Sequence, residues 1–201
     1  MRLYGYRRSP LVRQRAFVLM TRLLGARLDD VGQSILQRPQ LWGKPMMALT
    51  QGVLRGPSSW TVGERELLAA VVSEANSCSF CTATHSSIAD RALPAPTFAD
   101  WPNGAAGPAV TAAAHFVAKL TTTPDMIGPA DVDAARDAGV TEAALAEAVY
   151  VAFVFNVINR VADALEFTHR SERDRARGAD VLRRRGYRLP EFLFAGSADR
   201  R

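Results

Sequence analysis

The sequence lacks most of the features that assign a chain to a familiar class. No run of apolar residues is long enough to span a bilayer, so we expect no membrane association. No zinc-finger spacing, RNP-like strand or aromatic interleaving accompanies the basic residues, so we expect no nucleic-acid partner. Hydrophobic residues at 48% and charged residues at 22% indicate instead a soluble protein with a sizeable core.

The start of the chain contains the paired Arg7 and Arg8 of an export signal. However, Arg13, Arg15 and Arg22 interrupt the apolar stretch that such a signal needs, and no small-residue cleavage site follows. We therefore expect a cytoplasmic protein. A reducing cytoplasm disfavours a permanent structural disulfide and favours a catalytic or metal-binding role for paired cysteines.

Alternation of apolar and polar residues with period two is scarce. Apolar residues recur instead with helical spacing, and Gly and Pro separate the segments. We therefore predict an all-α fold in a single domain over residues 1–201, with a basic helix and tail from about residue 169. The other helices are expected at 11–24, in one or two short segments around Pro39 and Pro45, and at 61–76, 77–93, 108–121, 130–138 and 141–168.

The net charge of +5 is concentrated near the C-terminus. Residues 170–188 hold eight arginines against three acidic residues, and this surplus of five equals the formal charge of the whole chain. A solvated helix with acidic residues one turn from arginines accounts for the pattern, and contact with nucleic acid or an acidic partner is the alternative. The apolar stretch "RLPEFLF", residues 188–194, is suited to docking on a neighbouring subunit.

Both cysteines lie in one short segment, "NSCSFCTATH", residues 76–85. On a helix Cys78 and Cys81 share a face at i and i+3, and His85 continues that face four residues later. The thiols are then near enough to form a disulfide, and His85 can exchange a proton with Cys81. The first turn of the helix favours a thiolate at Cys78.

Three interpretations of this segment compete. We favour a redox pair, because the array uses the entire cysteine content of the chain. Zinc could take both thiolates and His85, but a structural site needs a fourth ligand, and neither His115 nor His169 has a partner at useful spacing. The third interpretation is two small buried thiols beside a hydrogen-bonded histidine. We expect no metal.

A carboxylate is placed to assist His85. Glu66 lies twelve residues before the first cysteine. In an antiparallel helical hairpin that turns at residues 75–78, Glu66 would return to the level of His85, orient its imidazole and raise its basicity. Glu64 and Glu74 are rivals, but Glu64 is spaced to cap its own helix and Glu74 lies only one turn before the first cysteine.

A polar stripe crosses the most apolar helix. Asn156, Asn159, Arg160 and Asp163 fall at i, i+3, i+4 and i+7 within a segment that is otherwise suited to burial. We interpret the stripe as a structural network that fixes helix packing or a subunit contact. The alternative is that it forms a wall of the reactive site and binds the substrate.

Residues 65–85, "RELLAAVVSEANSCSFCTATH", resemble the core motif of the AhpD-like alkylhydroperoxidases of the carboxymuconolactone decarboxylase superfamily. That motif is a glutamate, a spacing of twelve residues and then C-x-x-C-x-x-x-H. Residues 155–165, "FNVINRVADAL", resemble a segment common in the peroxidase-related branch. The two blocks cover about a sixth of the chain. The resemblance implies an all-helical AhpD-like fold whose cysteine helix lies in the core of a homo-oligomer: a dimer, trimer or hexamer.

The resemblance also implies a thiol-dependent hydroperoxide reductase without a bound cofactor. Cys81 would be oxidised by the peroxide, Cys78 would close the redox-active disulfide, and Glu66 and His85 would form the proton relay. Phe80 is a departure, because well-studied members carry a histidine there and one candidate proton carrier is therefore missing. The implied partners are a small-molecule hydroperoxide and a dithiol reductant, either a lipoyl group or a thioredoxin-like protein.

Two other functions stay open. One is a decarboxylase-like or isomerase-like reaction in the same pocket, although the decarboxylase branch typically lacks the cysteine pair. The other is a helical oligomer that binds a ligand or partner and uses its thiols only to sense redox state. Replacing Cys81 by serine separates them, since it abolishes peroxide reduction and leaves such binding intact.

Overall fold

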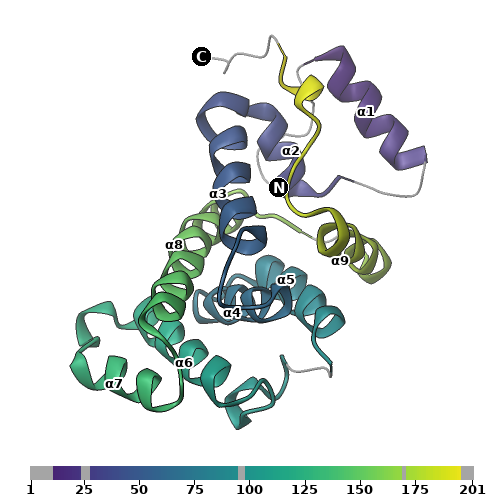
Figure 1. The fold of residues 1–201 in the computed structure, drawn as a ribbon. Helices are drawn as coiled ribbons and strands as arrows, with labels where there is room; N and C mark the ends of the chain where they lie inside the picture. The colour runs from purple at the N-terminus through teal and green to yellow at the C-terminus, as the bar shows by residue number, and fades with distance from the viewer. Residues whose placement is uncertain (1–10, 24–27, 95–97, 169–170, 196–201) are drawn as a thin grey trace.

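The computed structural model describes residues 11–23, 28–94, 98–168 and 171–195, and within these ranges it is built from helices without strands (Figure 1). The α-helices are α1 (Val12–Leu23), α2 (Asp30–Gln37), α3 (Lys44–Arg55), α4 (Val62–Ala75), α5 (Ser79–Ala92), α6 (Pro108–Thr122), α7 (Pro129–Asp137), α8 (Glu142–Ala164) and α9 (Glu172–Arg185). The short helices are the π-helix η2 (Pro39–Gly43) and the 3-10 helices η3 (Trp101–Asn103), η4 (Pro124–Met126) and η5 (Glu191–Leu193).

Helices α4 and α5 form the hairpin that carries the cysteines. At the start of α4, Thr61 accepts a hydrogen bond from the Glu64 amide, and the Glu64 carboxylate accepts one from the Thr61 amide, as the capping-box pattern predicts. The turn between the helices places Ser77 in the left-handed region at φ 59°, where few non-glycine residues lie. Its reversal brings α5 back alongside α4, so the predicted hairpin is confirmed.

The start of α5 differs in detail from the prediction. The helix begins at Ser79, and Cys78 is its N-cap residue, with φ −85° and ψ 89°, instead of a member of the first turn. Cys78 donates its amide to the Ser73 carbonyl, which holds the N-cap residue against the end of α4. The cysteine pair therefore spans the boundary between the turn and the helix.

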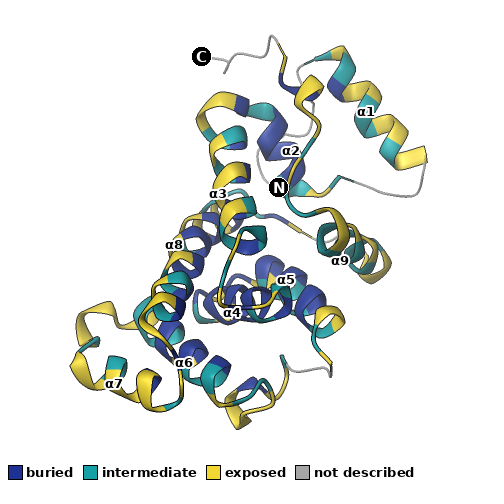
Figure 2. Ribbon diagram, in the orientation of Figure 1, coloured by how far each residue is buried: buried dark blue, intermediate teal, exposed yellow. Residues whose placement is uncertain are grey.

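The main core lies where α4 packs against α6 and α8. Both helices of the cysteine hairpin are largely buried, whereas α7 lies at the edge and is mostly exposed (Figure 2). Helix α8 is long and apolar enough to cross a membrane by length and composition, although polar side chains interrupt its apolar sequence. Its buried face packs on α4 and α6, as that of a core helix does.

A second hydrophobic cluster joins the two ends of the chain. Ile35, Leu36 and Met47 of α2 and α3 pack with Leu193 and Phe194 of the C-terminal segment. The buried Gln14 side chain of α1 adds hydrogen bonds to the carbonyls of Leu193 (3.0 Å) and Leu36 (3.5 Å). Leu193 and Phe194 of the stretch that is suited to docking on a neighbouring subunit therefore pack on their own chain, whereas Phe192 of the same stretch is 54% exposed.

Two further boundaries differ from the prediction. Helix α2 was not expected as a separate element, although Asp29 caps it through the Gly32 amide at 2.8 Å. Helix α8 ends at Ala164 instead of residue 168, because Glu166 adopts a left-handed φ of 49°. The paired Arg7 and Arg8, together with residues 95–97, 169–170 and 196–201, lie outside the described residues.

Candidate functional site

Glu66 and His85 meet inside the α4–α5 hairpin. The Glu66 Oε2 atom lies 2.6 Å from the His85 Nδ1 atom, and the Glu66 side chain is fully buried. Complete burial raises the pKa of Glu66, but hydrogen bonds from His85 and Tyr187 and the charges of His85 and Arg55 outweigh it and lower this pKa below its ordinary value. An ionised carboxylate accepts the Nδ1–H, so Nε2 is the ring atom that exchanges a proton.

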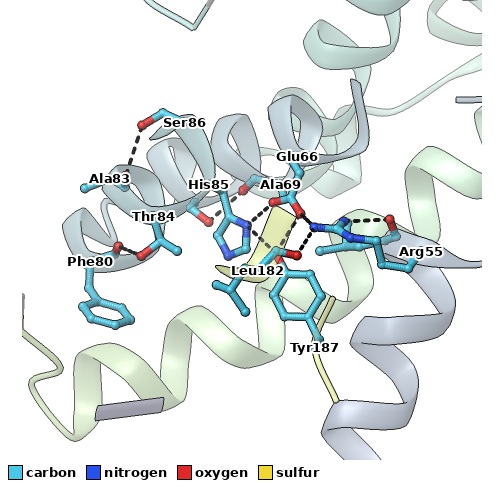
Figure 3. A network of polar contacts seen from close by, with 12 residues as sticks. Arg55, Glu66, Ala69, Phe80, Ala83, Thr84, His85, Ser86, Leu182 and Tyr187 are labelled. Atoms are coloured by element: carbon cyan, nitrogen blue, oxygen red, sulfur yellow. Dashed lines mark hydrogen bonds and ion pairs between the residues drawn. The ribbon is translucent and has the colours of Figure 1, made fainter. Parts of the chain in front are cut away.

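Two residues that were not predicted complete this group. Arg55, the last residue of α3, places Nη2 2.6 Å from the Glu66 Oε1 atom, and the Tyr187 hydroxyl donates to the same oxygen at 2.7 Å (Figure 3). The Arg55 guanidinium also lies 4.9 Å from the centre of the Tyr187 ring. Burial and the Glu66 charge raise the pKa of Tyr187 well above its ordinary value, so the phenol remains a hydrogen-bond donor.

The turn directly before Tyr187 has a backbone conformation that favours glycine. Gly186 has φ 71° and ψ −156°, and a Cβ atom there would lie 2.4 Å from the Gln51 Oε1 atom. The same Gln51 oxygen accepts the Tyr187 amide at 2.8 Å. A backbone reversal fixed by α3 therefore delivers the Tyr187 side chain to Glu66, which the dipeptide "GY" at the end of the basic helix could have suggested.

The two thiols interact directly. Cys78 and Cys81 are both free and buried, and each affects the ionisation of the other. Interaction with the Cys81 thiol lowers the pKa of Cys78, against the effects of burial and of Asp163. Interaction with Cys78, burial and the Cys78 charge raise the pKa of Cys81. The pair therefore loses its first proton easily and its second with difficulty.

A cavity of about 480 Å³ reaches one of these thiols. Cys81 and His85 line it together with Phe80, whereas Cys78 does not line it and is fully buried. Phe80 also meets Phe167 edge to face, with ring centres 5.7 Å apart. Acidity thus favours a thiolate at Cys78, and access from the cavity favours Cys81 as the atom that a substrate meets.

The polar stripe of α8 forms the structural network that we favoured. The Asn76 Nδ2 atom donates to the Oδ1 atoms of Asn156 (2.9 Å) and Asn159 (3.0 Å), and Arg160 donates to Asn76 Oδ1 at 3.1 Å. The stripe also influences the thiols, since Asn159 opposes the rise in the pKa of Cys81 and Asp163 opposes the fall in the pKa of Cys78. It therefore holds the hairpin turn on α8 and lies behind the cysteines, outside the cavity.

The zinc alternative finds no support in the described part of the chain. Within it, no three His, Cys, Asp or Glu side chains gather closely enough to hold a metal ion. His85 instead directs Nδ1 to Glu66. His115 packs against Trp101, with ring centres 5.0 Å apart, far along the chain from the cysteines.

Comparisons with known proteins confirm the fold. No protein-family model matches the chain, and no curated protein does. The chain is similar in structure to an uncharacterized peroxidase-related protein from Silicibacter sp. TM1040, with 24% identity and a TM-score of 0.68 over 83% of this chain and 88% of that one. It is also similar to an alkylhydroperoxidase AhpD core, an uncharacterized peroxidase-related protein from Ralstonia eutropha JMP134, with 19% identity and a TM-score of 0.64 over 84% and 93%. The chain thus has the all-α AhpD-like fold of the peroxidase-related proteins.

Proposed function

We propose that the protein is a thiol-dependent hydroperoxide reductase that converts ROOH to ROH while Cys78 and Cys81 become a disulfide. The observation that carries this proposal is the cavity in which Cys81 and His85 share one wall, with the Glu66 carboxylate behind the imidazole. A thiol, a base and an accessible space are the minimum that peroxide reduction requires. The AhpD-like fold supports the same reaction class.

The first step is attack by Cys81. His85 Nε2 takes a proton from the thiol pair, and the remaining proton lies between the two sulfurs, so the charge can reside on Cys81 when Cys78 holds that proton. The Cys81 thiolate attacks the terminal peroxide oxygen, the O–O bond breaks, and Cys81 becomes a sulfenic acid. The leaving alkoxide takes the proton from His85 and departs as an alcohol.

The second step closes the disulfide. Cys78 attacks the Cys81 sulfur, the S–O bond breaks, and the hydroxyl leaves as water with the proton of the Cys78 thiol. The sum is ROOH plus two thiols giving ROH, water and a disulfide. No bound cofactor is needed, but the disulfide must be reduced by an external dithiol, either a lipoyl group or a thioredoxin-like protein. A cytoplasmic homo-oligomer suits this cycle.

An intact-mass and free-thiol measurement tests the proposal. One equivalent of cumene hydroperoxide is added to the fully reduced protein, and we expect loss of both thiols with a mass decrease of two hydrogens. Cys78→Ser should stop at the sulfenic acid, whereas Cys81→Ser should keep its remaining thiol. Persistence of both thiols in the unaltered protein would show that the cysteines do not reduce peroxides.

A further inference from the structure

The cavity beside Cys81 is much larger than the peroxide group requires. Its volume of about 480 Å³ compares with the roughly 30 Å³ that one water molecule occupies in the liquid. Small-molecule sites in proteins have volumes of about 300 to 1,000 Å³. The proposed chemistry at Cys81 therefore uses a small part of the cavity and leaves most of it to the rest of the substrate.

We propose that this cavity selects hydroperoxides with a long apolar chain and an anionic end, that is, hydroperoxides of the fatty-acid class. The inference rests on the proposed function, because it names the substrate class of the same thiol site. It goes beyond that function, since neither the thiol pair nor the fold requires a chain of any length on the peroxide.

The walls of the cavity suit a hydrocarbon chain. They come from α1, α2, α3, α8 and α9 and carry Met20, Val31, Met46, Ile158 and Val181 among other apolar side chains. Binding of a hydrocarbon chain between apolar walls is favourable in proportion to the apolar area that it removes from water. Methionine side chains also adapt to bent or irregular chains, because they are unbranched and flexible.

Arginines line the open end of the cavity. Arg177, Arg185 and Arg188 all line it and are exposed, so they lie where it meets solvent. Within the described residues, the side chains of Arg185 and Arg188 have no hydrogen-bond or ion-pair partner. The two acidic residues of the lining are Asp29, whose carboxylate caps α2, and Asp174, so the net charge of the lining is positive. A carboxylate at this end would pair with the guanidinium groups.

A series of hydroperoxides tests the apolar part of the proposal. The second-order rate constant for Cys81 oxidation should rise from hydrogen peroxide through butyl and octyl to dodecyl hydroperoxide, by as much as about fourfold for each buried methylene. A carboxylate at the far end of the longest chain should raise it further at low salt. Equal rates for hydrogen peroxide and dodecyl hydroperoxide would overturn the inference.

Substitutions locate the effect within the cavity. Gly178 of α9 lines it, and a Cβ atom there meets no atom within 4 Å, so Gly178→Leu fills space and also improves helix propensity. We expect Gly178→Leu to reduce the ratio of the dodecyl to the hydrogen-peroxide rate at least tenfold. The double variant Arg185→Gln and Arg188→Gln should lose the preference for the carboxylate, and Arg184→Gln, an exposed arginine outside the cavity lining, is the matched control.

A binding measurement separates this inference from the proposed function. Dodecanoate and hexanoate are titrated calorimetrically into the Cys81→Ser protein, which needs no peroxide chemistry. If dodecanoate but not hexanoate binds tightly, and Gly178→Leu weakens that binding, the result supports the cavity assignment. If, in addition, no peroxide oxidises the thiols, only the proposed function is overturned. Thiol oxidation without dodecanoate binding or chain-length preference would leave the function standing and refute the substrate class.

Discussion

At the scale of single residues, the fully buried Glu66 carboxylate makes folding stability depend on pH. Its pKa is lower in the folded protein than in the unfolded chain, so its stabilising effect is fully present above the unfolded pKa of about 4.3 and is lost as the pH falls through the folded value. We predict that the unfolding free energy falls below about pH 4.5, and that Glu66→Gln loses this segment of the pH dependence. Urea denaturation at a series of pH values measures both curves.

The same substitution tests the proton relay. Glu66→Gln can present its amide N–H to His85 Nδ1, which stabilises the wrong tautomer and leaves Nε2 protonated. We expect the rate of thiol oxidation by peroxide to fall about 100- to 10,000-fold, the range of general acid–base contributions. Glu64→Gln is the control, since glutamine also completes a capping box. A rate within threefold of the unaltered protein would exclude Glu66 from the relay.

Tyr187 is a positioning residue that acts through Glu66. Tyr187→Phe keeps the ring beside Arg55 but removes the hydroxyl that donates to Glu66 Oε1 at 2.7 Å. Hydrogen bonds to charged groups are worth about 1.5–3 kcal/mol, so we predict a stability loss of that order and a smaller rate loss than Glu66→Gln causes. The pH–rate profile should shift toward higher pH, because Glu66 becomes more basic and holds the protonated imidazole more strongly. An unchanged profile with reduced stability would assign Tyr187 a purely structural role.

At the scale of elements, the turn after α9 decides whether Tyr187 reaches the site. Gly186→Ala would place a Cβ atom in the left-handed backbone and against the Gln51 side chain, at a cost of about 1–3 kcal/mol for the backbone alone. We expect a lower melting temperature together with slower thiol oxidation. Gly139→Ala is the matched control: its φ of 91° is also positive, but a Cβ there meets open space and the turn lies far from the thiols along the chain. It should lower stability only.

The elements that sequence reasoning predicted correctly are those fixed by local rules. The capping box at Thr61 and the apolar spacing that follows determine α4. The twelve-residue separation of Glu66 from Cys78 then places Glu66 opposite His85 once the chain reverses in the hairpin. Helix α8 was overextended because its amphipathic pattern continues beyond the left-handed Glu166. The spacing of apolar residues indicates which face of a helix is buried. A single residue with a left-handed backbone can end the helix without changing that spacing.

The contacts that escaped prediction join residues far apart in the sequence. Arg55 and Tyr187 reach Glu66 from α3 and from the segment after α9, 11 residues before it and 121 after it. No spacing rule connects them, because their approach depends on how α9 packs on α5 and on the fit of Gly186 against Gln51. The arginine-rich segment was correctly interpreted as a helix with an exposed face, but its position beside the cavity follows from the tertiary fold alone.

At the scale of the whole molecule, the two hydrophobic clusters differ in what they support: one surrounds the thiols and the other supports part of the cavity. The main cluster contains the thiols, whereas the second cluster holds α1, α2 and the C-terminal segment, which contribute many of the residues that line the cavity. Damage to the second cluster should therefore affect the cavity more than the thiols. Because the second cluster is small, the loss of one large side chain removes a substantial part of its buried area.

Phe194→Ala tests this division. The ring is 1% exposed among Ile35, Leu36, Met47 and Leu193, so its removal should cost about 3–5 kcal/mol locally. We expect amide hydrogen exchange to accelerate in α1, α2 and the C-terminal segment while α4 and α5 keep their protection.

Phe192→Ala is the control for that exchange pattern, because this ring is 54% exposed and does not belong to the buried part of the second cluster. It should change exchange little. Uniform acceleration through α4 and α5 in Phe194→Ala would mean that both clusters unfold as one unit. If exchange accelerates only in α1, α2 and the C-terminal segment, Phe194→Ala should still form the Cys78–Cys81 disulfide with hydrogen peroxide but lose its preference for long-chain hydroperoxides. The reason is that the thiols and the cavity walls then belong to separately stabilised parts of one molecule.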